Sequence, residues 1–205
     1  MSIVKLITEK LNSSIEKKGL ASLVVSGGSS PKKIFDELSN VDIEWSKVQV
    51  TLVDDRLVDA EDSNSNQRLL NENFFKNKAE NALFLPLSED LISNNKIKMP
   101  FDVNVLGMGE DGHFASLFPN MLADQDAFSI DANYKIFKTI PQGDPFLPRI
   151  TMNLSLILSS ELIILLVKGK AKQNILDISV NNETYPIHYL LKNRKNNFFI
   201  EKINE

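Results

Sequence analysis

The amino-acid sequence predicts an α/β fold of the Rossmann-like type: a mainly parallel sheet with helices on both faces, in a single domain over residues 1–205. Short apolar runs alternate with amphipathic stretches along the chain, and polar, glycine-bearing segments follow several of these runs. Strands that alternate with helices form right-handed βαβ units, which build parallel sheets covered on both faces. A length of 205 residues, without an internal repeat or a low-complexity linker, suits one domain.

In the first half of the chain, apolar residues at helical spacing predict helices, and short apolar runs predict strands. A proline opens the second helix, where its missing N–H costs nothing. In order, the expected elements are a helix over 4–15 that ends at Gly19, a strand over 22–25, a helix opened by Pro31, a strand over 48–55, a helix over 63–75 and a strand over 101–109.

The second half continues this alternation. Its most apolar run, over 161–170, is typical of a strand that is buried on both faces of a parallel sheet. In order, the expected elements are a strand over 135–140, a segment over 149–160 that starts extended and becomes helical, the strand over 161–170, a helix over 171–180 and a short closing strand over 196–202.

The composition excludes several classes of function. The net charge is −4 and the lysines are scattered, residues 192–195 being the closest to a basic run, so we expect no nucleic-acid partner. Cysteine is absent, which excludes disulfides, thiolate metal sites and cysteine nucleophiles. The longest apolar run, over 162–167, is far shorter than the ~20 residues of a membrane helix, and the N-terminal segment mixes charges with apolar residues. We therefore expect a cytoplasmic protein without a membrane partner.

Four polar segments follow predicted strands or open predicted helices. They cover residues 26–30, 54–56, 107–113 and 168–172. In an open parallel sheet, ligands bind outside the carboxyl ends of the strands. We therefore expect one pocket to collect all four segments.

The first of these segments, SGGSSP, is a candidate anion site. It places Gly27, Gly28, Ser29 and Ser30 directly before a helix N-terminus, where free backbone N–H groups and the helix dipole favour a phosphate. The alternative is a tight strand–helix turn with a serine cap. The segment is neither a P-loop nor a dinucleotide motif, because the required lysine and glycine spacings are absent.

Three cations are further candidates for binding a phosphate. Arg56 follows the second predicted strand, Arg149 follows a proline, and Lys172 lies in the segment GKAK. Arginine offers a planar fork of donors and lysine a mobile point charge. The alternative for each is a surface ion pair of little energetic value, but all three are expected at the mouth of one sheet.

His113 is one of two histidines and stands in the glycine-rich segment LGMGEDGHFASLFP, over 106–119. A metal site needs more histidine or cysteine ligands, so we expect no metal. A serine triad is conceivable with nearby serines, but no Gly-x-Ser-x-Gly elbow exists. The simplest interpretation is a general acid–base histidine oriented by Asp111. The other histidine, His188, has an apolar context and is expected on a helix surface or as a hydrogen-bonded core residue.

These segments together resemble the 6-phosphogluconolactonase family, within the superfamily of sugar-phosphate isomerases and glucosamine-6-phosphate deaminases. The matching pieces occur in the family's order: SGGSSP, VDDR with SNSNQRLL, LGMGEDGHFASLFP, PRITMNLSLIL and KGKAK. The deaminases share Asp-Gly-His but continue towards Ala-Phe-Asn-Glu-Pro. The tail ASLFP is similar to the lactonase branch.

The resemblance implies hydrolysis of 6-phosphoglucono-δ-lactone, a phosphorylated sugar lactone, in the oxidative pentose phosphate pathway, without a cofactor. It implies that His113 is the general base and that Arg149, Lys172 and the loop with Ser29 and Ser30 hold the phosphate. Arg56 is expected to face the substrate. In the mechanism that follows, backbone N–H groups of the loop with Gly107, Gly109 and Gly112 donate to the oxyanion. We expect a monomer or a weak homo-oligomer.

Three positions depart from the family's pattern. Asp55 stands where the family usually has Glu, Ser30 where it has Thr, and Phe114 where it has Thr. Only Phe114 changes the chemistry, because it removes a hydroxyl beside the histidine. Two alternatives stay open: a glucosamine-6-phosphate deaminase or sugar-phosphate isomerase, and a non-catalytic sugar-phosphate-binding protein.

Overall fold

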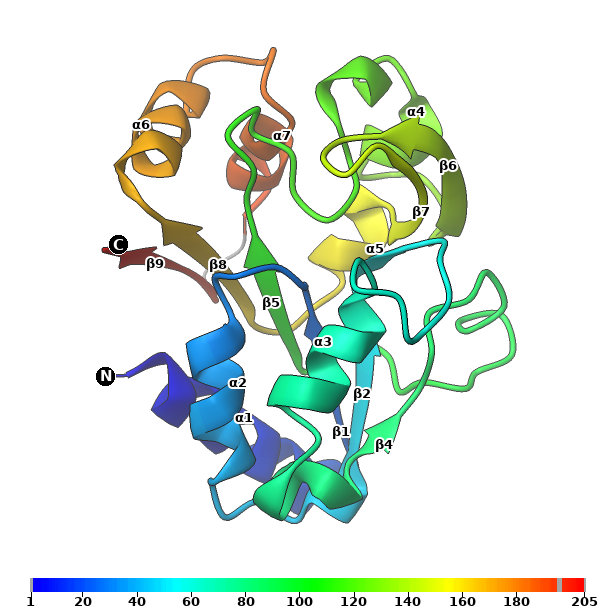
Figure 1. Ribbon diagram of the computed structural model, residues 1–205, viewed down its shortest axis with the longest axis vertical. Coiled ribbons are helices and arrows are strands. Elements are labelled where there is room, and N and C mark those ends of the chain that lie inside the picture. Colours follow the sequence, from blue (N-terminus) through cyan, green and yellow to red (C-terminus); the bar gives the residue numbers. More distant parts are fainter. Residues whose placement is uncertain (1, 195–196, 205) are drawn as a thin grey trace.

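A six-stranded parallel sheet forms the centre of the computed structural model, which describes residues 2–194 and 197–204 (Figure 1). The strand order is β4-β2-β1-β5-β8-β9, and every neighbouring pair is parallel. The expectation of a mainly parallel sheet with helices on both faces is confirmed. The strands are β1 (Ala21–Val25), β2 (Val48–Leu52), β4 (Leu83–Phe84), β5 (Val103–Gly107), β8 (Ile163–Lys168) and β9 (Phe198–Ile203).

Two apolar clusters cover the two faces of this sheet. On one face, the first helices pack against alternate residues of β1, β5 and β8, and on the other face the later helices pack against the residues between them. The first group is α1 (Ile3–Lys18), α2 (Lys32–Ser39) and α3 (Asn66–Asn73), and the second includes α4 (Gln125–Phe128), α5 (Leu154–Leu158), α6 (Lys170–Ser179) and α7 (Pro186–Lys192). Short 3-10 turns lie at Trp45–Lys47, Asn77–Asn81 and Pro119–Met121. None of the helices in the described ranges is long and apolar enough to span a lipid bilayer.

The chain reverses its winding direction between β1 and β5. From β1 the sheet grows through β2 to β4, and from β5 it grows the other way through β8 to β9. The loops that leave β1 and β5 therefore diverge and leave a crevice between them. Ser26 joins the two strand ends, since its N–H donates to the Val105 carbonyl at 2.8 Å and its Oγ accepts from the Gly107 N–H at 3.2 Å.

A second, antiparallel sheet has the order β3-β7-β6, with β3 at Asp54–Arg56, β6 at Ile136–Gln142 and β7 at Leu147–Met152. The expectation of one strand over 48–55 is therefore wrong. The run divides at Val53, whose N–H donates to Val25 of the parallel sheet at 2.9 Å and whose carbonyl accepts from Met152 of the small sheet at 3.0 Å. The strand expected over 135–140 belongs to the β6–β7 hairpin, outside the parallel sheet.

Sequence patterns locate most other elements to within a few residues. The expected helix over 63–75 is α3, which begins after Ser65, whose Oγ accepts from the Arg68 N–H at 3.2 Å. The closing strand is β9, and its expected first residue, Asn196, lies outside the described residues, as does Lys195 of the basic run. No strand was expected at β4 and no helix at α4, both of which are short.

A buried carboxylate ties the amino ends of the parallel strands together. Asp102 precedes β5 and is fully buried. It accepts from Ser14 Oγ of α1 at 2.7 Å, from the Ser22 N–H of β1 at 2.8 Å and from Lys18 Nζ at 3.2 Å, and it also pairs with Lys98. Burial acts to raise the pKa of Asp102, but the bonds from Lys98, Ser14 and Ser22 outweigh it and hold that pKa below its ordinary value. Asp102 therefore stabilises the fold in its ionised form.

Replacing this carboxylate should destabilise the fold strongly at neutral pH. Asp102→Ala leaves the partly buried Lys98 and the buried Ser14 and Ser22 without their acceptor, and we expect the free energy of unfolding to fall by about 3–5 kcal/mol in urea titrations at pH 7. The exposed pair of Asp42 with Lys78 is the matched control, and Asp42→Ala should change the value by less than about 1 kcal/mol.

The pH dependence gives a second readout of the same variant. Because the folded-state pKa of Asp102 is lowered, its contribution is complete above the ordinary value of about 3.9 and is lost as the pH falls below it. The difference between wild type and Asp102→Ala should therefore shrink in acid. A loss below about 1 kcal/mol at pH 7, or a loss that does not change with pH, would contradict this role.

Candidate active site

One pocket collects the four polar segments, as the sequence predicts. It has a volume of about 210 Å³ and opens at the carboxyl ends of β1 and β5. Asp111 and Gly112 do not line it, although Asp111 contacts His113 directly. The predicted residues that line it are Gly27, Gly28, Ser29, Ser30, Arg56, Gly107, Gly109, His113, Arg149 and Lys172. Ser26, Asp54 and Met108 of the predicted segments line it as well, and two further residues, Asn66 and Ala115, lie outside those segments.

The loop after β1 presents its backbone to this pocket. Gly28 has a φ of 85°, a left-handed conformation that favours glycine. A Cβ at Gly27 would lie 1.9 Å from the side-chain oxygen of Asn66, so only glycine lets α3 approach the loop this closely. Asn66 is held in turn, because its amide nitrogen donates to the Asp54 carbonyl at 3.0 Å. The loop is thus shaped by its contact with the start of α3, at the edge of the pocket.

Two arginines face each other across the β3–β7 ladder. Arg56 and Arg149 are directly paired in the antiparallel register, so their side chains leave the same face of the small sheet. Arg149 is only 4% exposed. Its Nε donates to the Gln142 carbonyl at 3.1 Å and its Nη2 to the Pro145 carbonyl at 3.1 Å. Arg56 Nη1 donates to the Asn64 carbonyl at 2.6 Å, while its Nε is buried without a partner.

Like charges in directly opposed positions are unfavourable unless an anion lies between them. Burial, together with the charge of Arg56, lowers the pKa of the Arg149 guanidinium below its ordinary value. Lys172 adds a third cation from α6, against the single lining carboxylate of Asp54. Asp54 already accepts from Ser116 Oγ at 2.5 Å. The excess of positive charge and the unused donors suit a multiply charged anion such as a phosphate.

The imidazole of His113 is fixed from three sides. Its Nδ1 lies 2.5 Å from the Asp111 carboxylate, which also accepts from the His113 backbone N–H at 3.1 Å. Its ring lies over Gly109, where a Cβ would stand 2.2 Å from the ring carbon Cε1. Phe118 stacks on the ring with a centroid distance of 4.4 Å and an interplanar angle of 29°. The histidine lines the pocket in one orientation, with Nδ1 engaged by a carboxylate.

The environment of Asp111 keeps this carboxyl ionised. Burial acts to raise the pKa of Asp111, but the hydrogen bonds from the His113 side chain and backbone and the charge of that ring hold it below its ordinary value. An ionised carboxylate accepts at Nδ1, so the proton of a neutral imidazole resides there and Nε2 is the basic nitrogen. The His113–Asp111 pair is therefore arranged as a general base with a fixed orientation would be.

The three glycines selected as oxyanion donors already use their N–H groups within the protein. Gly107 donates to Ser26 Oγ at 3.2 Å, Gly109 to the His113 carbonyl at 2.9 Å and Gly112 to the Gly109 carbonyl at 3.2 Å. The loop closes on itself, and an oxyanion would have to replace one of these bonds. The close approach of His113 to Gly109 and of Tyr185 to Gly112, which has a φ of 76°, explains the glycines at these two positions.

Phe114, which departs from the family's pattern, lies outside the pocket. It is fully buried in the apolar cluster with Leu106 and Met108. The next residue, Ala115, lines the pocket in its place with a φ of 49°. An aromatic residue after the histidine therefore adds to the core and removes no side chain from the pocket wall.

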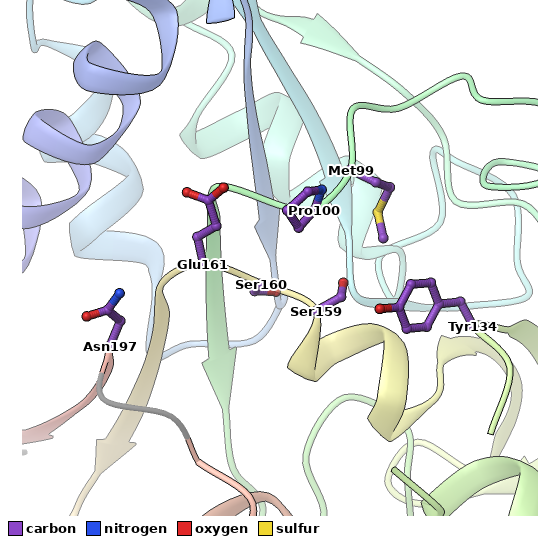
Figure 2. A pocket seen from close by; sticks show the side chains of 7 residues that line it. All are labelled: Met99, Pro100, Tyr134, Ser159, Ser160, Glu161 and Asn197. Atoms are coloured by element: carbon purple, nitrogen blue, oxygen red, sulfur yellow. The ribbon is translucent and has the colours of Figure 1, made fainter. Parts of the chain in front are cut away.

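A second and larger cleft, of about 900 Å³, lies at the opposite, amino ends of the strands. Figure 2 shows Pro100 and Glu161 on the segments that precede β5 and β8. Glu161 is already paired with Lys18 at 2.7 Å and with Lys10. The cleft contains no histidine or arginine and none of the residues selected from the sequence, so the smaller pocket is the candidate active site. Within the ranges 2–194 and 197–204, no three His, Cys, Asp or Glu side chains group as a metal site does.

A phosphorylated ligand should stabilise the fold through the arginine pair. A ligand that binds only the folded state adds RT ln(1 + [L]/Kd), about 2.7 kcal/mol at a hundredfold excess over Kd. We expect 6-phosphogluconate to raise the melting temperature, and unphosphorylated gluconate to do much less at equal ionic strength. Arg56→Gln should reduce the shift. Equal shifts from both sugars would remove the phosphate site from this pocket.

Gly109→Ala should displace the imidazole while the fold survives. The new methyl would overlap the His113 ring, which is partly exposed and free to move away. A displacement of this kind lowers kcat/KM by about 10²-fold when the group is catalytic. Kinetics and thermal melting of the purified variant test the expectation. A folded variant with activity within about threefold of wild type would show that the position of the ring is not important.

Comparison with known proteins places the chain in a family. Residues 1–199 match the family model described as glucosamine-6-phosphate isomerases/6-phosphogluconolactonase. The 6-phosphogluconolactonase of Neisseria meningitidis serogroup A is 34% identical over 208 residues, covering 94% of this chain and 89% of the relative. That of Caulobacter vibrioides is 35% identical over 196 residues, covering 89% and 83%.

Solved structures agree with this assignment. The crystal structure of a 6-phosphogluconolactonase from Shewanella baltica superposes with a TM-score of 0.87 at 33% identity, covering 99% of this chain and 91% of that chain. The chain therefore belongs to the glucosamine-6-phosphate isomerase/6-phosphogluconolactonase family.

Proposed function

We propose that this family member hydrolyses 6-phosphoglucono-δ-lactone to 6-phosphogluconate, with His113 as the general base. One observation carries the proposal: a histidine oriented by a carboxylate shares a small pocket with two arginines that make no salt bridge within the described residues. A general base and a separate anion site in one pocket suit a substrate whose phosphate lies away from the reacting carbon. The relatives with 34–35% identity carry the name of this activity.

The phosphate binds where the positive charge is concentrated. Arg56 and Arg149 hold it from the small sheet, and Lys172 and the loop with Ser29 and Ser30 hold it from the parallel sheet. These contacts do not change during the reaction, so they position the lactone and supply binding energy for its orientation. The lactone ring then extends towards His113.

His113 accepts a proton from a water molecule at Nε2 while the water oxygen attacks the lactone carbonyl carbon. The carbonyl becomes a tetrahedral oxyanion, and Asp111 stabilises the positive charge that forms on the imidazole. The oxyanion then re-forms the carbonyl as the bond to the ring oxygen breaks, and the imidazolium returns its proton to that oxygen. A lactone carbonyl is electrophilic enough that these steps need neither a covalent nucleophile nor a cofactor.

The alternatives predict different products from the same pocket. The direct experiment measures hydrolysis of freshly prepared 6-phosphogluconolactone, corrected for spontaneous opening, beside ammonia release from glucosamine-6-phosphate. We expect lactone hydrolysis and no ammonia. Ammonia release would favour a deaminase, and tight phosphate-dependent binding without either reaction would favour a non-catalytic binding protein. A cytoplasmic location and a monomer or weak homo-oligomer stay predictions.

His113→Ala and Arg149→Ala should fail in different ways. Loss of a general base acts in the transition state, so His113→Ala should lower kcat by about 10²–10⁴-fold with little change in KM. Arg149 contacts a group that does not react, so Arg149→Ala should mainly raise KM. A charge-assisted hydrogen bond of about 1.5–3 kcal/mol corresponds to a loss of about 10–150-fold in kcat/KM.

Full Michaelis–Menten curves near pH 7 separate these outcomes. Arg68 is the matched arginine control, because it is exposed, pairs with Glu72 and does not line the pocket. Arg68→Ala should leave both constants near wild type. If Arg149→Ala lowers kcat as much as His113→Ala and leaves KM unchanged, Arg149 acts on the reacting carbonyl and the phosphate assignment is wrong.

A further inference from the structure

We propose that Phe118 is a positioning residue whose ring holds the general base and the phosphate-binding arginine in place together. The proposal rests on the proposed function, because it assigns roles to His113 and Arg149. Phe118 does not line the pocket and is 4% exposed, so it acts through these two side chains.

The ring contacts both functional groups. Its centroid lies 4.4 Å from that of His113, with the planes inclined by 29°, which is a stacked arrangement. The Arg149 guanidinium carbon lies over the same ring, 5.3 Å from its centroid. His113 comes from the loop after β5 and Arg149 from β7 of the small sheet. Phe118 is thus a direct physical link between the two sheets at the candidate site.

The hairpin between β6 and β7 is shaped to allow this contact. Gly143 has a φ of 74°, and a Cβ there would lie 2.7 Å from Phe118 Cζ and 2.8 Å from Arg149 Nη2. The carbonyls of Gln142 and Pro145, on either side of this glycine, accept from Arg149. The hairpin carbonyls therefore hold the guanidinium by its nitrogens, while its carbon lies over the aromatic ring.

An aromatic ring attracts a cation, which an aliphatic side chain of similar size does not. The face of a phenyl ring is electron-rich and attracts a guanidinium or an imidazolium. Stacking on Phe118 should therefore favour the charged imidazole that forms when His113 accepts a proton. It should also keep Arg149 in place in a buried position where, within the described residues, it forms no salt bridge.

Other charges face His113 and act on it independently of the ring. Asp111 is hydrogen-bonded to it, and Asp54, Arg56, Arg149 and Lys172 line the same pocket. A substitution at Phe118 leaves all of these residues in the sequence. A change in the titration of His113 in such a variant therefore reports the loss of the ring or a movement of Arg149, both of which the proposal predicts.

The test compares aromatic and aliphatic replacements. Phe118→Leu removes the ring and keeps apolar volume, Phe118→Met is a second non-aromatic variant in case the first does not fold, and Phe118→Tyr keeps the ring. Phe128→Leu is the matched control, because Phe128 is 5% exposed, about as buried as Phe118, packs on Tyr189 and does not line the pocket. Thermal melting identifies the variants that fold.

Three measurements are made on each folded variant: kcat and KM, the affinity for 6-phosphogluconate, and the NMR titration midpoint of the His113 ring, with His188 as the internal reference. For the non-aromatic variants we expect kcat to fall about 5–10-fold and KM to rise by a similar factor. Affinity for 6-phosphogluconate should fall with the rise in KM. Loss of the ring should move the NMR titration curve of His113 to lower pH relative to wild type, while that of His188 stays unchanged.

Phe118→Tyr and Phe128→Leu should stay near wild type in all three measurements. The proposal is overturned if folded Phe118→Leu or Phe118→Met keeps wild-type kinetics, ligand affinity and His113 titration. It is also overturned if Phe118→Tyr is as defective as the aliphatic variants, or if Phe128→Leu shows the same loss. A wild-type chain that fails to hydrolyse the lactone would contradict the proposed function instead, and ligand affinity and the titration would still decide the role of Phe118.

Discussion

Two arginines held opposite each other, neither of which forms a salt bridge in the part of the chain that the structure describes, are the constraint on which the candidate site depends. The β3–β7 register pairs Arg56 with Arg149, and burial and the charge of Arg56 both lower the pKa of the Arg149 guanidinium. The fold compensates with carbonyl acceptors from Asn64, Gln142 and Pro145. Under the proposed function, a phosphate between the two guanidinium groups offsets the repulsion between them.

The parallel sheet supplies the other half of the site. Its winding reverses between β1 and β5, so the glycine loop at 27–30 and the histidine loop at 107–113 diverge from neighbouring strand ends. Val53 joins the two halves, because its N–H completes the parallel ladder and its carbonyl begins the antiparallel one. Backbone hydrogen bonds therefore position the His113 loop relative to the two arginines, and Phe118 adds a side-chain contact across the same junction.

Local sequence patterns predict those parts of the site that depend on residues close together in the chain. SGGSSP precedes a helix and His113 follows a strand. Both are therefore predicted at the edge of the sheet where the carboxyl ends of the parallel strands meet. The facing of Arg56 and Arg149 was not predictable, since it depends on an antiparallel register between segments about ninety residues apart. The same holds for Asn66 against Gly27, because only tertiary packing brings α3 to the glycine loop. The contact of Phe118 with Arg149 also joins two separate segments, whereas residue type alone suggests only a core role for Phe118.

The position of the phosphorus atom in a crystal structure of the complex with 6-phosphogluconate tests the account most directly. The account predicts phosphate oxygens within hydrogen-bonding distance of the guanidinium groups of both Arg56 and Arg149, and the carboxylate carbon of the product beside Nε2 of His113. A complex in the opposite orientation, with the carboxylate between the arginines and the phosphate beside His113, would contradict it. So would a product bound in the larger cleft at the amino ends of the strands.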